Sequence, residues 1–356
     1  MFIYSIGEQV CMLNNDGLKN WIKEYLPGQL LGDDIDLAVV SGDAGFRKYF
    51  RINSRPPMVA TYAPPQQENN IGFVRIGLAL SRAGVHTPRV YAVDYKHGYL
   101  LQEDLGAELY QDSLTAQTAE GLYERAEAVL LKIQQVPADT HVFPEYCVDR
   151  LRDEMALFCQ WFVVELLGHP LTIAEQQMLE RLFDVLVNNA LEQPQVVVHR
   201  DFHSRNLMLL PNHDVGVIDF QDAVIGPSTY DLVSLLRDCY VHWPQSLVNQ
   251  RMCRFLHKAK EAGLAAEDVT EQQYERWFDL MGLQRHIKVL GIFARLCLRD
   301  GKSGYLADLP LVIRYTLEVA QRYADTQDFY QWFTSVLLEI SAQQDWYQDW
   351  HTAGEA

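Results

Sequence analysis

Residues 196–220 read VVVHRDFHSRNLMLLPNHDVGVIDF, and this stretch indicates both the fold and the chemistry of the chain. Its three consecutive valines predict a short buried strand, which leads into a polar turn that contains Asp201. A second apolar run, at 215–218, predicts another strand that ends at Asp219. We expect the two strand ends to bring these carboxylates to one point.

The polar turn has the spacing H-x-D-x-x-x-x-N, with His199, Asp201 and Asn206, and I-D-F follows at 218–220. Phosphoryl transfer from a nucleotide needs a carboxylate for the proton of the attacking hydroxyl, and an amide and second carboxylate for Mg²⁺. We interpret Asp201 as the catalytic base, and Asn206 and Asp219 as Mg²⁺ ligands with suitable hard oxygen donors. His199, the other candidate catalytic residue, is expected to hold the loop by hydrogen bonds more than to do chemistry. The alternatives are a loop-capping role for Asp201 and a turn role for Asp219.

The length and charge of the chain limit the classes of protein to which it can belong. At 356 residues it is long enough for a full core and suggests two lobes. Its 47 acidic and 30 basic residues give a formal net charge of −17, which argues against nucleic acid or an anionic membrane as a partner. We expect a small-molecule substrate, and the sequence predicts no particular oligomeric state.

The cysteines and the apolar runs indicate a cytoplasmic protein. The six cysteines are scattered, without a C-x-x-C pair or a neighbouring His pair, and are expected to be reduced thiols. The N-terminal segment has no Lys or Arg before Lys19 and does not resemble a signal peptide. No run approaches the roughly 18 apolar residues of a transmembrane helix. Met1 and Met12 are both candidate translation starts.

The first hundred residues alternate short apolar segments with turn residues and predict a small α+β lobe. Helices are expected at 15–26 and 68–84, and strands at 37–40, 46–53, 58–63, 89–94 and 98–102. The connector at 102–106 is the expected lobe boundary. We therefore predict an N-terminal nucleotide-binding lobe at 1–104 and a C-terminal catalytic and acceptor-binding lobe at 105–356.

The turn between the first two strands is a candidate phosphate-binding tip. Small residues allow backbone N–H groups to approach a polyphosphate closely, and Arg47 and Lys48 add positive charge. The residues of this tip are Gly42, Asp43, Ala44 and Gly45. An ordinary hairpin turn is the alternative interpretation, because glycine is common in such turns.

Beyond the connector, helical periodicity dominates. Apolar stripes and capping patterns predict helices at 118–135, 151–166, 172–186 and 232–240, and residues 245–340 look helical almost throughout. The chain is therefore predicted to be an α+β protein in which a small β-rich lobe precedes a larger, mainly helical lobe.

A β-rich lobe followed by a helical lobe with HRDFHSRN and VIDF resembles the protein-kinase-like fold, and more narrowly the aminoglycoside phosphotransferase and choline kinase superfamily. The shared motifs are H-x-D-x-H-x-x-N at 199–206, I-D-F-x-x-A at 218–223 and G-P-x-x-Y-D-L at 226–232. The resemblance implies ATP and Mg²⁺ as cofactors, a catalytic loop anchored by Asp231, and adenine contacts from the connector. The connector residues concerned are Gln102, Glu103 and Asp104.

The GDAGFRKYFR tip and the LLQEDLG connector are more specifically similar to the anomeric sugar kinases of bacterial cell-wall recycling. These enzymes place phosphate from ATP on the C1 hydroxyl of N-acetylmuramate and N-acetylglucosamine. The resemblance implies such an amino sugar as the substrate. An aminoglycoside or other amino-alcohol acceptor, and a non-catalytic nucleotide-binding module, are the alternatives. Candidate acceptor-binding residues are His203, Arg205, which suits a lactyl carboxylate, and Asp222.

One departure from the superfamily concerns the third strand, which usually carries a Lys or Arg that grips the phosphates and pairs with a helix Glu. Here that strand, at 58–63, reads MVATYA and has no basic residue. We then expect Arg47 or Lys48 of the hairpin to supply the charge, and Glu68 to lose its usual reason for an ion pair.

Overall fold

The computed structural model describes residues 16–26, 35–40 and 46–355, and the chain divides into two compact units. The first unit comprises the described residues up to Glu108 and the segment Met208–Gln221. The second comprises Leu109–Leu207 and the described residues from Asp222 onwards. The predicted lobe boundary after residue 104 stays a prediction. The division into units places the segment that contains Asp219 together with the N-terminal residues.

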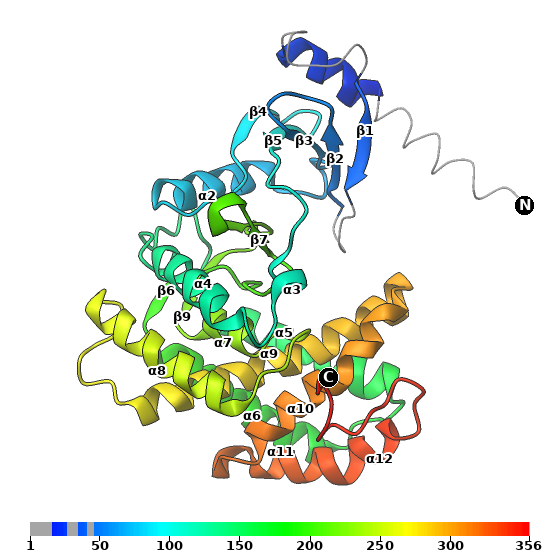
Figure 1. Ribbon diagram of the computed structural model, residues 1–356. Coiled ribbons are helices and arrows are strands. Elements are labelled where there is room, and N and C mark those ends of the chain that lie inside the picture. Colours follow the sequence, from blue (N-terminus) through cyan, green and yellow to red (C-terminus); the bar gives the residue numbers. More distant parts are fainter. Residues whose placement is uncertain (1–15, 27–34, 41–45, 356) are drawn as a thin grey trace, which may run out of the picture. The chain divides into compact units, whose positions relative to one another are not determined.

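The first unit is built on a five-stranded antiparallel sheet with the strand order β1-β2-β3-β5-β4 (Figure 1). Its strands are β1 (Leu37–Val40), β2 (Lys48–Ile52), β3 (Met58–Tyr62), β4 (Val90–Asp94) and β5 (Tyr99–Glu103). All five lie close to the predicted ranges, because short apolar runs bounded by turn residues are a strong strand signal.

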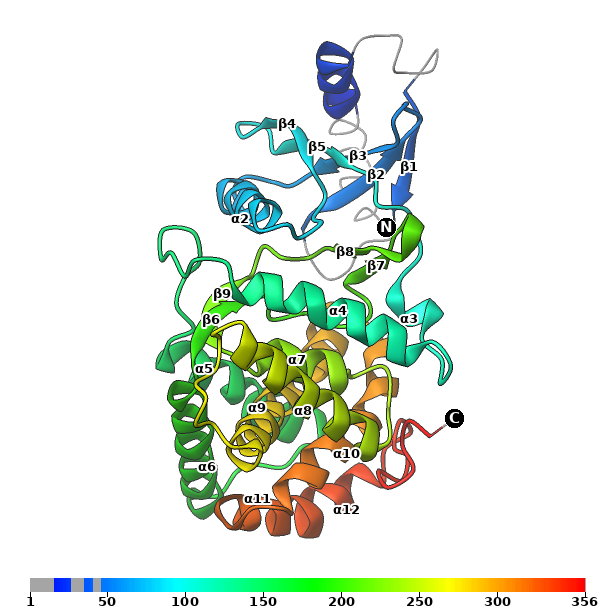
Figure 2. The same cartoon turned by 60° about the vertical axis from the view of Figure 1, so that its left-hand side comes forward.

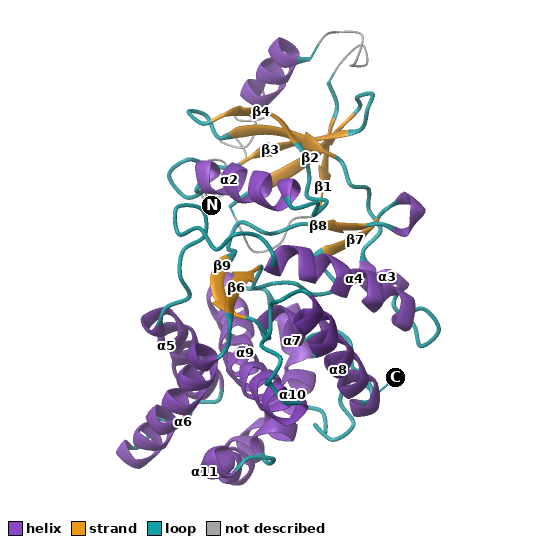
Figure 3. Ribbon diagram, turned by 90° about the vertical axis from the view of Figure 1, so that its left-hand side faces the viewer, coloured by secondary structure: helices purple, strands orange, loops and turns teal. Residues whose placement is uncertain are grey.

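Helices cover both faces of this sheet (Figure 3). The helix at 16–25 packs Leu18, Trp21 and Ile22 against a cluster of buried strand side chains that includes Phe50 and Leu101. The opposite face is covered by α2 (Asn70–Arg82), whose Asn69 cap accepts a hydrogen bond from the Gly72 amide at 2.9 Å. The predicted order of one helix before the strands and one among them is confirmed.

The segment from 208 to 221 belongs to the first unit and forms most of a second, two-stranded sheet. This sheet pairs β7 (Leu207–Leu209) with β8 (Val215–Val217), which are connected by the short 3-10 turn η3 (Pro211–His213). A parallel bridge joins Gly216 of β8 to His86, which lies between α2 and β4. Asp219 therefore follows a strand that is tied to the N-terminal unit.

The second unit is mainly helical, as predicted (Figure 2). Its helices are α3 (Tyr110–Ser113), α4 (Ala119–Gln134), α5 (Val148–Leu157), η2 (Phe158–Leu166), α6 (Ile173–Glu192), α7 (Tyr230–Leu236), α8 (Gln245–Glu261), α9 (Glu271–Asp300), η4 (Ser303–Asp308), α10 (Leu309–Ala320), η5 (Ala324–Thr326), α11 (Gln327–Trp332), η6 (Phe333–Leu337) and α12 (Leu338–Ser341). The single helix predicted at 151–166 is α-helical only as far as Leu157 and continues as the π-helix η2. No helix in the described ranges is both long and apolar enough to cross a membrane.

The long helix α9 forms the centre of the second unit and contacts α5, η2, α6, α7, α8 and α10 (Figures 1 and 2). Its buried residues lie all around the helix, as expected of a core helix. Gly291 permits the tightest of these approaches, since a Cβ atom there would lie 2.5 Å from the backbone nitrogen of Phe158. That contact falls where α5 changes into η2.

We expect Gly291→Ala to lower the free energy of unfolding by about 2–3 kcal/mol, because the added methyl group would push two backbones apart. The matched control is Gly121→Ala in α4, where a Cβ meets nothing closer than the Arg125 side chain at 3.6 Å. This control should raise stability by roughly 0.5–1 kcal/mol through the better helix propensity of alanine. Equal stability of the two variants in urea unfolding would contradict the close packing of α9 on η2.

Candidate active site

The catalytic loop follows β6 (Gln195–Val198), which pairs with β9 (Val224–Pro227) in the second unit. As predicted, Asp231 at the start of α7 anchors this loop. Its buried carboxylate accepts hydrogen bonds from the backbone N–H groups of His199 at 2.6 Å and Arg200 at 2.9 Å. Burial raises the pKa of Asp231 to about 6, against the opposing effects of His199 and the two amide donors. The loop is thus fixed at the two residues that precede Asp201.

The backbone at Arg200 is in the left-handed region, with φ of 78°. Such a conformation is uncommon outside glycine and persists where surrounding contacts hold it, often at functional sites. Here the guanidinium of Arg200 pairs with Glu154 and lies over the ring of Tyr146 at 5.5 Å from its centroid. This conformation sets the direction of the chain at Asp201.

The carboxylate of Asp201 lies near the cations Lys288 and Arg200 and the imidazole of His203, all in the second unit. Burial raises its pKa, but Lys288, His203 and Arg200 outweigh that effect and hold the pKa at about 2. Lys288 comes from α9, where its Nζ donates to the Tyr230 hydroxyl at 3.1 Å and pairs with Glu154 at 3.3 Å. The carboxylate is therefore ionised throughout the neutral pH range.

The other polar residues of the loop hold its shape. The Nδ1 atom of His199 accepts a hydrogen bond from the Asp201 amide at 3.3 Å, which agrees with the loop-holding role expected for this histidine. The Nδ2 atom of Asn206 donates to the Asp201 carbonyl at 3.0 Å, so the amide oxygen of Asn206 is directed away from that carbonyl. The ring of His203 packs edge-on against Tyr240, and burial lowers its pKa.

The first unit carries the other predicted metal ligand, Asp219, whose backbone is also left-handed, with φ of 63°. Its Oδ1 atom accepts a hydrogen bond from Nε2 of Gln221 at 2.6 Å. The next residue, Phe220, stacks on Phe73 of α2 at 4.8 Å and lies against Gly77 of the same helix. The contact with α2 fixes the position of Asp219 within the unit. Because β6 and β8 belong to different sheets and units, the convergence of Asp201 and Asp219 remains a prediction.

Arg47 directly precedes β2 and is buried, whereas Lys48, the first residue of β2, is exposed. The guanidinium packs over the ring of Phe73 at 4.4 Å, on the same side chain that Phe220 stacks on. Its Nη2 atom pairs with Glu68 at 3.2 Å, while Nε and Nη1 are buried without a described hydrogen-bond partner. The expectation that Glu68 loses its ion pair is wrong, since an arginine from the hairpin reaches the glutamate that a strand lysine usually pairs with.

The remaining nucleotide-binding candidates divide into two groups. Gly42, Asp43, Ala44 and Gly45 lie outside the described residues. In the connector, Gln102 donates to Thr61 at 2.8 Å, Glu103 contacts His86 at 3.1 Å, and Asp104 binds Arg51 at 2.9 Å. These side chains hold the first unit together, so an adenine contact from the connector would have to come from its backbone.

Of the other acceptor-binding candidates, Arg205 lies near His203 and Asp222 does not. Arg205 lies over the ring of Tyr240 at 3.4 Å and donates from Nε to Gln111 at 2.7 Å. The side chain of Asp222 is exposed, and its carbonyl accepts a bond of 3.5 Å from Arg200. The loop therefore gathers His203 and Arg205 around one aromatic ring and leaves Asp222 outside that group.

Sequence reasoning missed two buried cations of α9, Arg285 and Lys288. The signal was present in the run QRHIKVLG, where basic residues interrupt an otherwise apolar helix. Helical periodicity alone does not tell which other element such residues meet. Their position beside the catalytic loop depends on the tertiary packing of α9 against α7.

Comparison with known proteins identifies the family. The model of the phosphotransferase enzyme family, known as APH, matches residues 36–268. This chain belongs to that family. The predicted enzyme class, a phosphotransferase with an alcohol group as acceptor, is confirmed.

Three curated bacterial relatives carry the name N-acetylmuramate/N-acetylglucosamine kinase. The protein from Pseudomonas putida is 44% identical over 288 residues, which are 80% of this chain and 84% of that protein. Those from Pseudomonas aeruginosa and Neisseria meningitidis are 42% and 36% identical, over 85% and 92% of this chain and 90% and 96% of their own. The predicted resemblance to this group is confirmed.

Solved structures confirm the fold. The ADP-bound aminoglycoside phosphotransferase APH(2'')-Ib matches 86% of this chain and 98% of its own, with a TM-score of 0.55 at 16% identity. A choline kinase from Streptococcus pneumoniae matches 85% and 99%, with a TM-score of 0.57 at 11% identity. At such low identity these structures establish the protein-kinase-like α+β fold and no particular substrate.

We expect Asp201→Ala to lower turnover about 10³-fold with little change in nucleotide affinity, because the carboxylate would act on the acceptor hydroxyl in the transition state. The matched control is Asp153→Ala, at an exposed position of α5, which should keep normal activity. Steady-state kinetics and nucleotide titration provide the two measurements. Normal turnover in the Asp201 variant would remove it as the base.

Proposed function

We propose that this protein is an ATP-dependent kinase that transfers the γ-phosphate to the anomeric C1 hydroxyl of N-acetylmuramate and N-acetylglucosamine. Such a reaction would serve the recycling of cell-wall sugars in the cytoplasm. The names of the curated relatives, at 36–44% identity, support an amino-sugar acceptor. The observation that carries the chemistry is the ionised Asp201 carboxylate on a loop fixed by Asp231.

Asp201 would act on the acceptor hydroxyl. Phosphoryl transfer passes through a loose transition state, in which the nucleophile gains little bonding before the leaving group departs. A carboxylate with a pKa of about 2 is a weak base, but it suits a reaction in which the hydroxyl proton leaves late. Its main contribution would be to orient the hydroxyl in line with the phosphate and then to take its proton.

Asn206 and Asp219 would hold Mg²⁺. An amide oxygen and a carboxylate are hard donors, and Mg²⁺ is usually bound by one or two such groups together with the phosphates of the substrate. The bond from Asn206 to the Asp201 carbonyl sets the direction of its amide, and the left-handed backbone at Asp219 sets that of its carboxylate. The ion, when bound, neutralises charge on the phosphates.

Arg47 would grip the nucleotide phosphates in place of the missing strand lysine. Glu68 holds one side of the guanidinium at 3.2 Å, and the ring of Phe73 supports its face. Buried N–H groups without partners are costly, and the Nε and Nη1 atoms of Arg47 have none within the part of the chain that the structure describes. An anionic phosphate oxygen would satisfy them with charge-assisted hydrogen bonds.

The acceptor is tested by incubating the protein with ATP, Mg²⁺ and N-acetylmuramate, N-acetylglucosamine or kanamycin, with products identified by phosphorus NMR. We expect a C1 phosphate on both amino sugars and no change to kanamycin. A phosphorylated antibiotic would instead identify an aminoglycoside acceptor. Nucleotide binding without any turnover would identify a non-catalytic module.

The role of Arg47 is tested by Arg47→Gln. We expect the KM for ATP to rise about 10- to 100-fold, since a charge-assisted hydrogen bond contributes about 1.5–3 kcal/mol. Arg47→Lys should recover part of the loss, and Lys48→Gln, at the exposed neighbour, should change the KM little. Equal effects of the Arg47→Gln and Lys48→Gln substitutions would contradict the assignment, and unfolding temperatures control for misfolding.

A further inference from the structure

Buried cations in the described part of the chain are paired with carboxylates, with one exception. The paired residues are Arg47, Arg200, Arg237, Arg251, Lys288 and Arg314. Arg285 of α9 has 3% of its surface exposed and forms no ion pair within the described residues. The hydrogen bond described for its guanidinium runs from Nη1 to the Sγ atom of Cys239, at 3.2 Å.

A thiol is a weak acceptor, so the hydrogen bond described for this guanidinium does not neutralise its charge as a carboxylate would. Burial would lower the pKa of Arg285, but Cys239, Tyr230 and the more distant carboxylates of Asp238 and Asp201 outweigh it and raise the pKa above its usual value. The side chain is therefore charged. Charged groups that are taken out of water are normally paired, because their desolvation costs several kcal/mol. A ligand that carries an anionic group would supply the missing partner.

The two residues that flank Cys239 in the sequence place Arg285 beside the catalytic loop. The residue before it, Asp238, accepts hydrogen bonds from the backbone N–H and the hydroxyl of Ser204, at 2.9 Å and 2.5 Å. The residue after it, Tyr240, carries Arg205 over its ring at 3.4 Å. Arg285 thus contacts a segment that is hydrogen-bonded to the Asp201 loop through Asp238 and touches it through the ring of Tyr240.

Aromatic side chains pack in a row that begins at Tyr240 of this segment. Tyr240 stacks on Phe293 of α9 with ring centroids 6.3 Å apart, and Phe293 lies against Tyr305 at 5.1 Å. Aromatic walls with a few charged groups are typical of small-molecule sites. The segment beside the loop therefore combines a cation with a set of rings.

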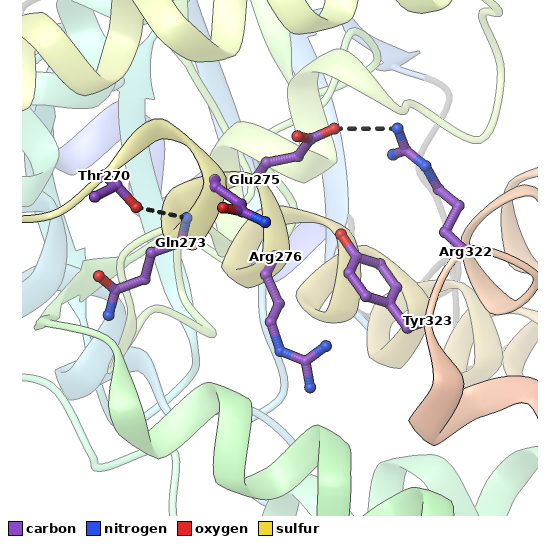
Figure 4. A pocket seen from close by; sticks show the side chains of 7 residues that line it. Thr270, Gln273, Glu275, Arg276, Arg322 and Tyr323 are labelled. Carbon is purple, nitrogen blue, oxygen red and sulfur yellow. Dashed lines mark hydrogen bonds and ion pairs between the residues drawn. The ribbon is translucent and has the colours of Figure 1, made fainter.

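A polar groove at the start of α9, lined by Arg276, Arg322 and Tyr323 among others, contains charged side chains that are paired with carboxylates (Figure 4). Its Arg322 pairs with Glu275 at 3.1 Å, its Arg276 pairs with Asp325 at 2.7 Å, and its Tyr323 donates to Asp279 at 2.8 Å. The charges of this groove are satisfied within the protein. Arg285 differs in having no carboxylate within ion-pair distance among the residues that the structure describes.

We propose that Arg285 binds the carboxylate of an acidic amino-sugar acceptor and so sets the preference of the enzyme for acidic over neutral sugars. This inference rests on the proposed function. It assigns to Arg285 the contact that the sequence suggested for Arg205, whose Nε is already bonded to Gln111. Recognition would use charge-assisted hydrogen bonds from the guanidinium to both carboxylate oxygens.

The test compares N-acetylmuramate, which has a lactyl carboxylate, with N-acetylglucosamine, which has none. For Arg285→Gln we expect kcat/KM to fall about 10- to 100-fold with N-acetylmuramate. Activity with N-acetylglucosamine should change by less than about threefold. Arg285→Lys should recover part of the loss, and Arg276→Gln, a partly exposed arginine on the same helix, should leave both activities unchanged.

The unfolding temperature separates binding from a structural role. Since Arg285 is a buried cation without a carboxylate partner, Arg285→Gln should keep or raise the unfolding temperature. Equal losses with both sugars would overturn the inference and point to contact with the transferred phosphate. Marked destabilisation would also overturn it, in favour of a structural role.

Calorimetric titration of the two sugars keeps this test independent of turnover. Weaker binding of N-acetylmuramate by Arg285→Gln, with unchanged binding of N-acetylglucosamine, supports the inference. Equal binding of N-acetylmuramate by wild type and variant overturns it. By contrast, absence of turnover of either sugar by the wild-type protein overturns the proposed function.

Discussion

One buried carboxylate holds the catalytic loop in place. Asp231 accepts hydrogen bonds from two consecutive backbone N–H groups, those of His199 and Arg200. Without it, both donors would be buried and unpaired, at a cost comparable to lost hydrogen bonds. The left-handed backbone of Arg200 is uncommon for a residue with a side chain and persists because this anchor and the pair with Glu154 hold it. The position of Asp201, and with it every later step of the proposed chemistry, depends on this interaction.

Each of the two units contains a buried cation that is incompletely paired within the described residues. Buried cations cost free energy unless a carboxylate or a ligand satisfies them. In the first unit Arg47 pairs with Glu68 through one nitrogen, and its two other nitrogens have no hydrogen-bond partner among the described residues. In the second unit Arg285 donates to a thiol and forms no ion pair with a carboxylate in the described part of the chain. Unsatisfied cations are expected where anionic ligands bind, and a sugar kinase with an acidic acceptor needs one such place for phosphate and another for a carboxylate.

Much of this structure was predictable from local signals. Apolar runs between turn residues located the five strands of the first sheet, and the spacing of His199, Asp201 and Asn206 identified the loop. What failed depends on tertiary contacts. The partner of Glu68 is an arginine that lies outside the strand where the superfamily usually has a lysine. The incomplete pairing of Arg285 can be seen only once its neighbours in the fold are known. The change from α5 to the π-helix η2 likewise has no signature in an apolar stripe.

The central claim is that Asp201 and Asp219 act on the same phosphate. A crystal structure with a non-hydrolysable ATP analogue, Mg²⁺ and N-acetylmuramate tests it most directly. The account predicts the Asp201 carboxylate within about 2.6–3.2 Å of the C1 hydroxyl oxygen. It also predicts oxygens of Asn206 and Asp219 at about 2.0–2.1 Å from one Mg²⁺ ion on the nucleotide phosphates. A complex in which Asp201 and Asp219 face separate regions, with the acceptor hydroxyl remote from Asp201, would contradict it.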